Sequence, residues 1–170
     1  MTTMETATFQ TVQVHRVWIR ATPEAIWDAI TKPEWTERYG YSGRADFDLR
    51  PGGAYRSLAT PQQKAHGLPD VVVDGEVIEA DPPRRLVHTM RMLVDEEAMS
   101  AGFTRVTYEI EPGVGGATQV TVTHDVSTAP QIAAVVGGGA AGTGAGGGWP
   151  FILSDLKSLL ETGEALGYQP

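Results

Sequence analysis

The C-terminal stretch from Gly146 to Leu166 is the feature that most constrains the fold. Its apolar residues recur at three- and four-residue spacings, with charged residues largely between them; they are Ile152, Leu153, Leu156, Leu159, Leu160 and Leu166. This period predicts a single amphipathic helix that opens at Trp149 and Pro150. Gly163 falls on or near its buried side, where we expect it to permit close backbone approach. Such a stripe must be buried against other elements.

The chain before this helix is rich in strand signals. Runs of β-branched and aromatic residues, bounded by Gly, Pro and Asp, predict strands at 10–20, 45–49, 54–59, 71–80, 84–93, 103–111 and 114–126. Thr22 as N-cap and Pro23 after it predict a short helix over 22–30, and a second is expected over 34–39. We expect loops at 60–70 and 94–102 and a weak helix at 130–136.

This order predicts an α+β, helix-grip fold. Short turns between successive strands imply an antiparallel meander, and a large sheet twists enough to wrap around a helix. We therefore expect a curved seven-stranded sheet around the long C-terminal helix, with two short helices after the first strand. The 170 residues fit one domain over 9–167, a loose tail over 1–8 and a glycine-rich mobile loop over 137–148.

Composition narrows the function classes. The chain has no cysteine, which excludes disulfides and cysteine-based metal sites, and its formal net charge of −8 argues against nucleic acid as a partner. No apolar run is long enough to span a bilayer, so no membrane insertion is expected. The first residues lack a secretory signal pattern, which leaves a cytoplasmic location as the expectation.

Five sequence segments in this order resemble a known family. They are Ala21 to Ile30, Thr31 to Trp35, Arg50 to Tyr55, Gly75 to Leu86 and Gly148 to Gly163. The chain resembles the START-like superfamily, also called SRPBCC or birch-pollen-allergen-like, over about residues 12–166. Within it, the chain is similar to the branch of activator of heat-shock protein 90 ATPase homologue-like proteins. The resemblance implies a sheet gripping a C-terminal helix, with an apolar cavity between them that suits a hydrophobic or lipid ligand.

Three titratable side chains are candidates for chemistry. Strand alternation places His88, Tyr108 and His124 on the inward face, where they could move protons or orient a ligand. No acidic partner is tied to either histidine by spacing, so we favour a structural role and assign no catalytic residue. We expect Trp18 and Trp27 in the core. The candidate ligand-binding set comprises Trp35, Tyr39, Tyr55, His88, Met90, Tyr108, His124, Trp149, Phe151, Ile152 and Leu156.

Other motifs carry little weight. Residues 142–147 match G-x-G-x-x-G, but no strand precedes them and no βαβ unit follows, so a hinge or lid is the better interpretation. The four histidines lie in different segments without a metal-ligand spacing, and there is no G-x-S-x-G. We expect no metal and no cofactor.

The sequence leaves three functions open. The first is binding of a small hydrophobic or aromatic molecule. The second, found in the superfamily, is a polyketide cyclase, aromatase or dehydratase-like enzyme that uses pocket His and Tyr side chains; it would gain support if His88 and Tyr108 lay within hydrogen-bond reach. The third is a co-chaperone-like interaction module of the stress response. It needs an exposed apolar patch on the outer face of the sheet, where we expect mostly polar residues. Free sheet edges make a homodimer plausible.

Overall fold

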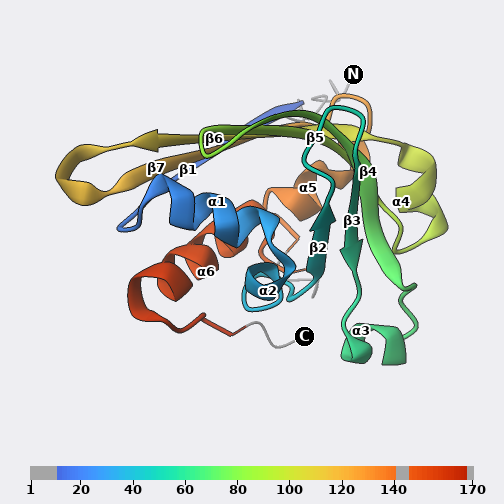
Figure 1. The fold of residues 1–170 in the computed structure, drawn as a ribbon. Coiled ribbons are helices and arrows are strands. Elements are labelled where there is room, and N and C mark those ends of the chain that lie inside the picture. The colour runs from blue at the N-terminus through green and yellow to red at the C-terminus, as the bar shows by residue number, and fades with distance from the viewer. Residues whose placement is uncertain (1–10, 141–145, 168–170) are drawn as a thin grey trace, which may run out of the picture.

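A computed structural model describes residues 11–140 and 146–167. Seven antiparallel strands form one sheet in the order β1-β7-β6-β5-β4-β3-β2 (Figure 1). The strands are β1 (Val12–Ile19), β2 (Arg44–Phe47), β3 (Ala54–Leu58), β4 (Val71–Asp81), β5 (Arg85–Met92), β6 (Thr104–Pro112) and β7 (Thr118–Asp125). The sheet curves over the helices below it, which confirms the α+β helix-grip prediction.

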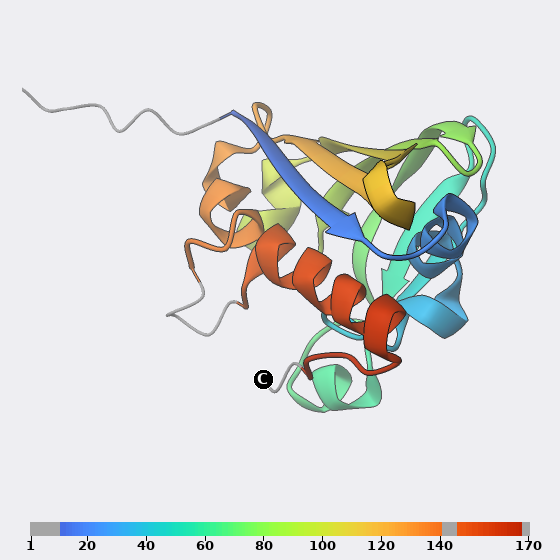
Figure 2. The ribbon, with the colours of Figure 1, turned by 90° about the vertical axis from the view of Figure 1, so that its left-hand side faces the viewer.

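The helices gather mainly under the concave side of the sheet. They are α1 (Pro23–Thr31), α2 (Pro33–Thr36), α3 (Pro61–Ala65), α4 (Glu96–Ala101), α5 (Ala133–Val136) and α6 (Gly148–Thr162). Figure 2 shows α6 crossing beneath the sheet beside β1. Short 3₁₀ turns occupy Val114–Gly116, where we expected the last strand to begin, and Pro130–Ile132.

The C-terminal helix is shorter than the sequence suggested. Gly163 adopts a left-handed conformation with φ of 83° and ends α6, its N–H donating to the Leu159 carbonyl. The prediction that Gly163 lies within the helix against another backbone is therefore wrong, because an added Cβ there would meet no atom within 4 Å. Leu166 lies beyond the helix and is exposed. A glycine just past the last apolar turn is the usual helix stop.

The first helix follows its sequence signals. Thr22 Oγ1 accepts a hydrogen bond from the Ala25 N–H at 3.2 Å, and Pro23 occupies the first turn. Such a cap satisfies one of the N–H groups that the first turn leaves unpaired. The second helix ends at Thr36, three residues earlier than expected.

Two short helices lie where we expected loops. Thr60 and Gln63 form a reciprocal capping box at the start of α3, and Asp95 Oδ1 accepts from the Ala98 N–H at 2.7 Å at the start of α4. The loop predictions for 60–70 and 94–102 are wrong over these turns. Both helices have good caps but no apolar stripe, so periodicity did not reveal them.

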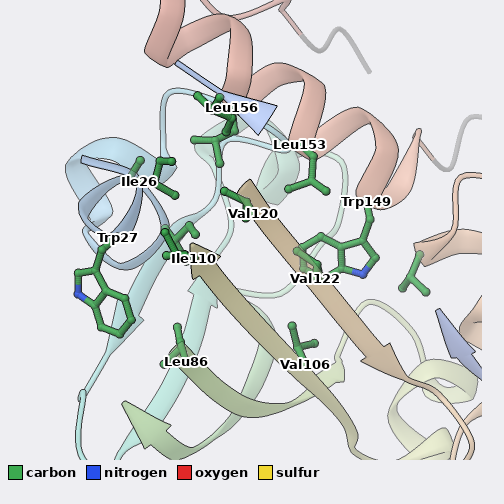
Figure 3. Close-up of a cluster of buried hydrophobic side chains, with 14 of the residues drawn as sticks. Ile26, Trp27, Leu86, Val106, Ile110, Val120, Val122, Trp149, Leu153 and Leu156 are labelled. Atoms are coloured by element: carbon green, nitrogen blue, oxygen red, sulfur yellow. The ribbon is translucent and has the colours of Figure 1, made fainter. Parts of the chain in front are cut away.

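The core lies between the sheet and the two long helices. Figure 3 shows Ile26 and Trp27 from α1 and Leu153 and Leu156 from α6 close to inward residues of β5, β6 and β7. Trp27 is buried as expected, but Trp18 is 53% exposed, so its prediction as a core residue is wrong. Alternation along β1 turns Ile19 inward and Trp18 outward.

Two predicted segments are only partly within the described residues. The tail over 1–8 lies outside them, as do residues 141–145 of the glycine-rich 137–148 segment. The G-x-G-x-x-G match at 142–147 falls mostly in this gap. The described end of the segment, Gly148, already belongs to α6.

Candidate functional site

An inner cavity of about 210 Å³ lies between the concave face of the sheet and the helices. Its walls come from the ends of α1 and α2, from the segment between α2 and β2, from five strands, and from α5 and α6. Residues from these elements include Tyr39, Tyr41, Phe47, Tyr55, Val73, His88, Met90, Met92, Tyr108, Val136, Trp149 and Ile152. Among the described residues that line this cavity there is no Asp, Glu, Lys or Arg, so the space is apolar and uncharged apart from its histidine and hydroxyl groups.

Strand pairing explains why these side chains meet. On β5, Leu86, His88 and Met90 share one parity, and Leu86 and His88 are fully buried. The antiparallel register places Leu86 opposite Tyr108 on β6 and His88 opposite Val77 on β4. Opposite residues on paired strands face the same side of a sheet. The cavity face therefore follows from the period-two pattern of the strands.

His88 lies within a cluster of aromatic rings. Its ring centroid is 4.4 Å from that of Tyr55, 5.4 Å from that of Phe47 and 6.0 Å from that of Tyr108. Tyr108 in turn meets Trp149 edge to face at 5.9 Å. Offset and edge-to-face contacts of this kind are favoured by the ring quadrupoles. The cluster forms a continuous aromatic wall from β2 to α6.

One nitrogen of His88 has a hydrogen bond and the other has none. Nδ1 lies 2.8 Å from the Thr89 carbonyl oxygen and donates to it. Burial lowers the pKa of His88 to about 4, although the Thr89 hydrogen bond acts in the opposite direction. The ring is therefore neutral at pH 7, and Nε2 carries a lone pair. Among the residues that the structure describes, Nε2 is the buried side-chain polar atom without a partner.

Three tyrosines of the cavity, Tyr39, Tyr55 and Tyr108, are also uncharged. Burial raises the pKa of Tyr55 to about 12 and raises that of Tyr108 and Tyr39 well above the usual value of a phenol. The Tyr39 hydroxyl donates to the Ala29 carbonyl at 2.9 Å, which fixes this ring against α1. At neutral pH the cavity thus presents no net charge to a ligand.

A second buried histidine supports the wall from behind. The Trp149 indole N–H donates to His124 Nδ1 at 3.0 Å, so the hydrogen of the neutral ring lies on Nε2. That nitrogen is 2.7 Å from Thr104 Oγ1, whose hydroxyl donates to the Met90 carbonyl at 3.3 Å. Burial and the nearby His88 lower the pKa of His124 to about 4. This chain of hydrogen bonds fixes Trp149, and with it the start of α6.

The inner cavity adjoins a larger outer pocket of about 1080 Å³. Tyr41, Val73, Met92 and Val135 line both spaces, and so they mark the passage between them. The outer pocket is bounded by α3 and α4, the two helices that sequence periodicity missed. Polar side chains such as Gln62, His66 and Glu97 form part of its lining.

The structure brings together most of the candidate ligand-binding residues. Seven of them line the inner cavity, and they are Tyr39, Tyr55, His88, Met90, Tyr108, Trp149 and Ile152. Four are not among its lining residues. His124 lies behind Trp149, Leu156 is packed in the core, Phe151 stacks on Tyr41, and Trp35 carries the Arg38 guanidinium over its ring.

Sequence reasoning missed several lining residues. Phe47 and Met92 have the inward parity of their strands, a signal that was available in the sequence. Val135 lies on α5, whose four residues are too few to show a helical period. His88 and Tyr108 stack with their rings 6.0 Å apart, and no hydrogen bond joins these two described side chains.

A family model for Activator of Hsp90 ATPase homolog 1-like protein matches residues 20–161. The chain belongs to this family. The match confirms the resemblance stated from the five sequence segments, and it covers strands β2 to β7 and α6 up to its penultimate residue. No curated protein matches the sequence of this family member.

Several solved structures of other proteins have the same fold as this Activator of Hsp90 ATPase homolog 1-like chain. CalU16 from Micromonospora echinospora is 21% identical, with a TM-score of 0.61 over 89% of this chain and 77% of its own. The Aha1 dimer from Colwellia psychrerythraea is 20% identical, with a TM-score of 0.61 over 91% and 98%. DynU16, a protein in the dynemicin biosynthetic locus, is 21% identical, with a TM-score of 0.63 over 93% and 50%.

Metal-binding groups and membrane-spanning helices are both absent from the described ranges, 11–140 and 146–167. These ranges hold no group of three or more His, Cys, Asp or Glu side chains placed to bind a metal ion. Within the same ranges, no helix is long and apolar enough to cross a membrane.

Proposed function

We propose that this protein binds a small hydrophobic or aromatic molecule in the inner cavity. The observation that carries the proposal is the cavity itself, an uncharged space of about 210 Å³ walled by aromatic rings. Protein interiors are close-packed, and few of their voids exceed a water molecule. Ligand pockets usually measure about 300–1,000 Å³, so the inner cavity suits a small ring system whose remaining part extends into the outer pocket.

The fold supports this proposal because it closes the cavity on two opposite sides. The strands provide a fixed wall, α6 closes the opposite side, and the hydrogen bond between His124 and Trp149 holds the junction. A ligand would then enter the inner cavity from the side bounded by α3 and α4. Short helices with few buried contacts are the elements that open most easily.

A cavity-filling variant tests the proposal. Ala45 is 7% exposed and lines the cavity, whereas Ala54 on the next strand is exposed. We expect Ala45→Phe to weaken binding of the neutral dye N-phenyl-1-naphthylamine about tenfold or more, because the added ring occupies the ligand's volume. Ala54→Phe is the matched control and should leave binding unchanged. Equal dye affinity in both variants would place the bound dye elsewhere and contradict the proposal.

Catalysis of the cyclase type has weaker support. A general base works best with a pKa near the operating pH, and a pKa of about 4 makes His88 a weak base at neutral pH. The stacked arrangement of His88 and Tyr108 also lacks the hydrogen bond that a proton-transfer pair would use. We therefore rank binding ahead of an enzymatic role.

Protein interaction has one observation in its favour. Val12, Val14 and Trp18 on the outer face of β1 are 48%, 50% and 53% exposed, where we had expected mostly polar residues. β1 is also an edge strand of the sheet. Apolar residues gathered on an edge invite pairing with another chain. Because one solved structure of this fold is described as a dimer, we propose a second copy of this chain as the partner.

Sedimentation velocity tests this self-association. Wild-type protein should sediment as a concentration-dependent dimer, and Trp18→Ser should shift it toward the monomer by removing apolar contact area. Met99→Ser, which alters another exposed apolar side chain, on α4, is the control and should keep the dimer. A wild-type protein that remains monomeric at high concentration would rule out the homodimer.

A further inference from the structure

We propose that the inner cavity selects a neutral aromatic ligand that donates one hydrogen bond, through a hydroxyl or N–H group, to His88 Nε2. This inference rests on the proposed function and specifies the ligand class of the same cavity. It starts from a single atom. Nε2 is a buried acceptor without a partner among the described residues, on a side chain that lines the cavity.

The direction of the hydrogen bond is fixed by the other ring nitrogen. Because His88 Nδ1 donates to the Thr89 carbonyl, the hydrogen of the neutral imidazole is committed to that side. Nε2 can then act only as an acceptor. A ligand with a carbonyl or an ether oxygen at this point would place its own lone pair against that of Nε2. A phenol, an enol or an N–H group would instead donate a hydrogen bond to Nε2. A buried acceptor left without a hydrogen bond costs free energy, so ligands that donate to Nε2 are favoured over ligands that do not.

The surroundings of His88 specify the rest of the ligand. Phe47, Tyr55 and Tyr108 present rings on its sides, which favours a flat aromatic partner. The described lining carries no cation to balance an anionic ligand and no carboxylate to balance a cation. A charged ligand would lose its hydration without compensation, so the phenol must enter in its neutral form.

Access to the nitrogen needs only side-chain movement. Nε2 is itself buried, so a donor reaches it after its neighbours shift. Met90 and Met92, on the same wall as His88, have unbranched side chains that adjust readily to a new shape.

The test compares two probes of nearly equal shape, 1-naphthol and 1-methylnaphthalene, by titration of the protein's tryptophan fluorescence. The ratio of their dissociation constants in wild type is compared with the ratio in His88→Phe, so that differences in probe hydration cancel. We expect the preference for 1-naphthol to be about three- to tenfold larger in wild type than in His88→Phe, which is the size expected for one hydrogen bond. Phe47→Leu changes the same wall but removes no polar atom. It should weaken the binding of both probes and leave the ratio of their dissociation constants as in wild type.

Two further measurements need no substitution. Addition of 1-naphthol to wild type should move the ¹⁵N resonance of His88 Nε2, and addition of 1-methylnaphthalene should not. Affinity for 1-naphthol should fall as the pH rises through the ionisation of its own hydroxyl, while affinity for 1-methylnaphthalene stays constant. These readouts keep the inference testable if His88→Phe fails to fold.

The outcomes separate this inference from the proposed function. If both probes bind with the same ratio in wild type and His88→Phe, and the Nε2 resonance stays in place, the selection by His88 is overturned while the cavity remains a binding site. If neither probe binds to wild type, the proposed function fails for small aromatic molecules, and the inference fails with it.

Discussion

Asp155 is a carboxylate on the buried face of α6, where it is 1% exposed. Its Oδ2 accepts from the Gly40 N–H at 2.7 Å, and its Oδ1 accepts from the Leu166 N–H at 2.5 Å. Buried charges persist in proteins where hydrogen bonds satisfy them. This residue thus joins α6 to the segment after α2 and to the chain that follows Gly163. The segment after α2 also forms part of the cavity wall.

Replacing Asp155 by Asn should lower the free energy of unfolding by about 1–3 kcal/mol. An amide offers one acceptor oxygen, so one of the two backbone N–H groups would face an NH₂ group instead. Urea denaturation measures the change. Glu164→Gln, an exposed substitution two residues before Leu166, serves as the control and should change stability by less than about 0.5 kcal/mol. Equal effects of the two substitutions would show that Asp155 has no special role.

At the scale of elements, α6 is positioned by its first residue. Gly148 has φ of 61°, and an added Cβ would lie 2.3 Å from the Val136 carbonyl oxygen and 2.6 Å from the Gly138 nitrogen. The helix therefore begins in direct backbone contact with the end of α5. Trp149 follows at once, so the same contact sets where the indole meets His124 and the cavity.

Gly148→Ala and Gly163→Ala form a matched pair at the two ends of α6. Both residues have positive φ, but only at Gly148 would the new methyl group collide with backbone. We expect about 1 kcal/mol of destabilisation at Gly163 and at least about 2 kcal/mol at Gly148. Thermal unfolding of the two variants gives the comparison. Similar losses at both ends would mean that α5 moves aside at little cost.

The elements also show which parts of the fold a single sequence can predict. The seven strands and α1 carry strong period-two or capping signals, and their positions agree within a few residues. α3 and α4 are five and six residues long, too short for a helical period, although their caps were present in the sequence. In the site, strand parity indicates that His88 and Tyr108 turn inward. The hydrogen bond between His124 and Trp149 depends on how α6 docks, which no local pattern encodes.

At the scale of the molecule, two buried neutral histidines link stability to pH. The pKa of both His88 and His124 is lowered to about 4, whereas in an unfolded chain each titrates near 6.5. Between these values the unfolded chain binds more protons than the folded protein, so stability falls as the pH decreases through this window. For His124 there is also a direct cause, since a protonated Nδ1 could no longer accept the Trp149 N–H.

We expect the free energy of unfolding to be highest above about pH 6.5 and to fall by several kcal/mol, on the order of 3–6, between pH 6.5 and 4. Urea denaturation across this range measures it. His88→Phe should remove a large part of the dependence, because the variant has one buried histidine fewer. Asp125 and Glu161, whose pKa values are lowered by hydrogen bonds to Ser127 and Lys157, lose their contribution at the acidic end of this range and below it. A flat profile between pH 6.5 and 4.5 would contradict this account.

The pairing of β1 with β7 has a consequence for biosynthesis. Val12 lies opposite Asp125, and Ile19 opposite Thr118, so the first strand of this sheet in chain order is joined to the last. About 100 residues must emerge between them, which takes roughly 5–20 s at ribosomal speed. During that interval Val12, Val14 and Trp18 belong to a strand that has no neighbour on either side. Until β7 is made, β1 is therefore open to aggregation and to chaperone binding, and closure of the sheet comes late.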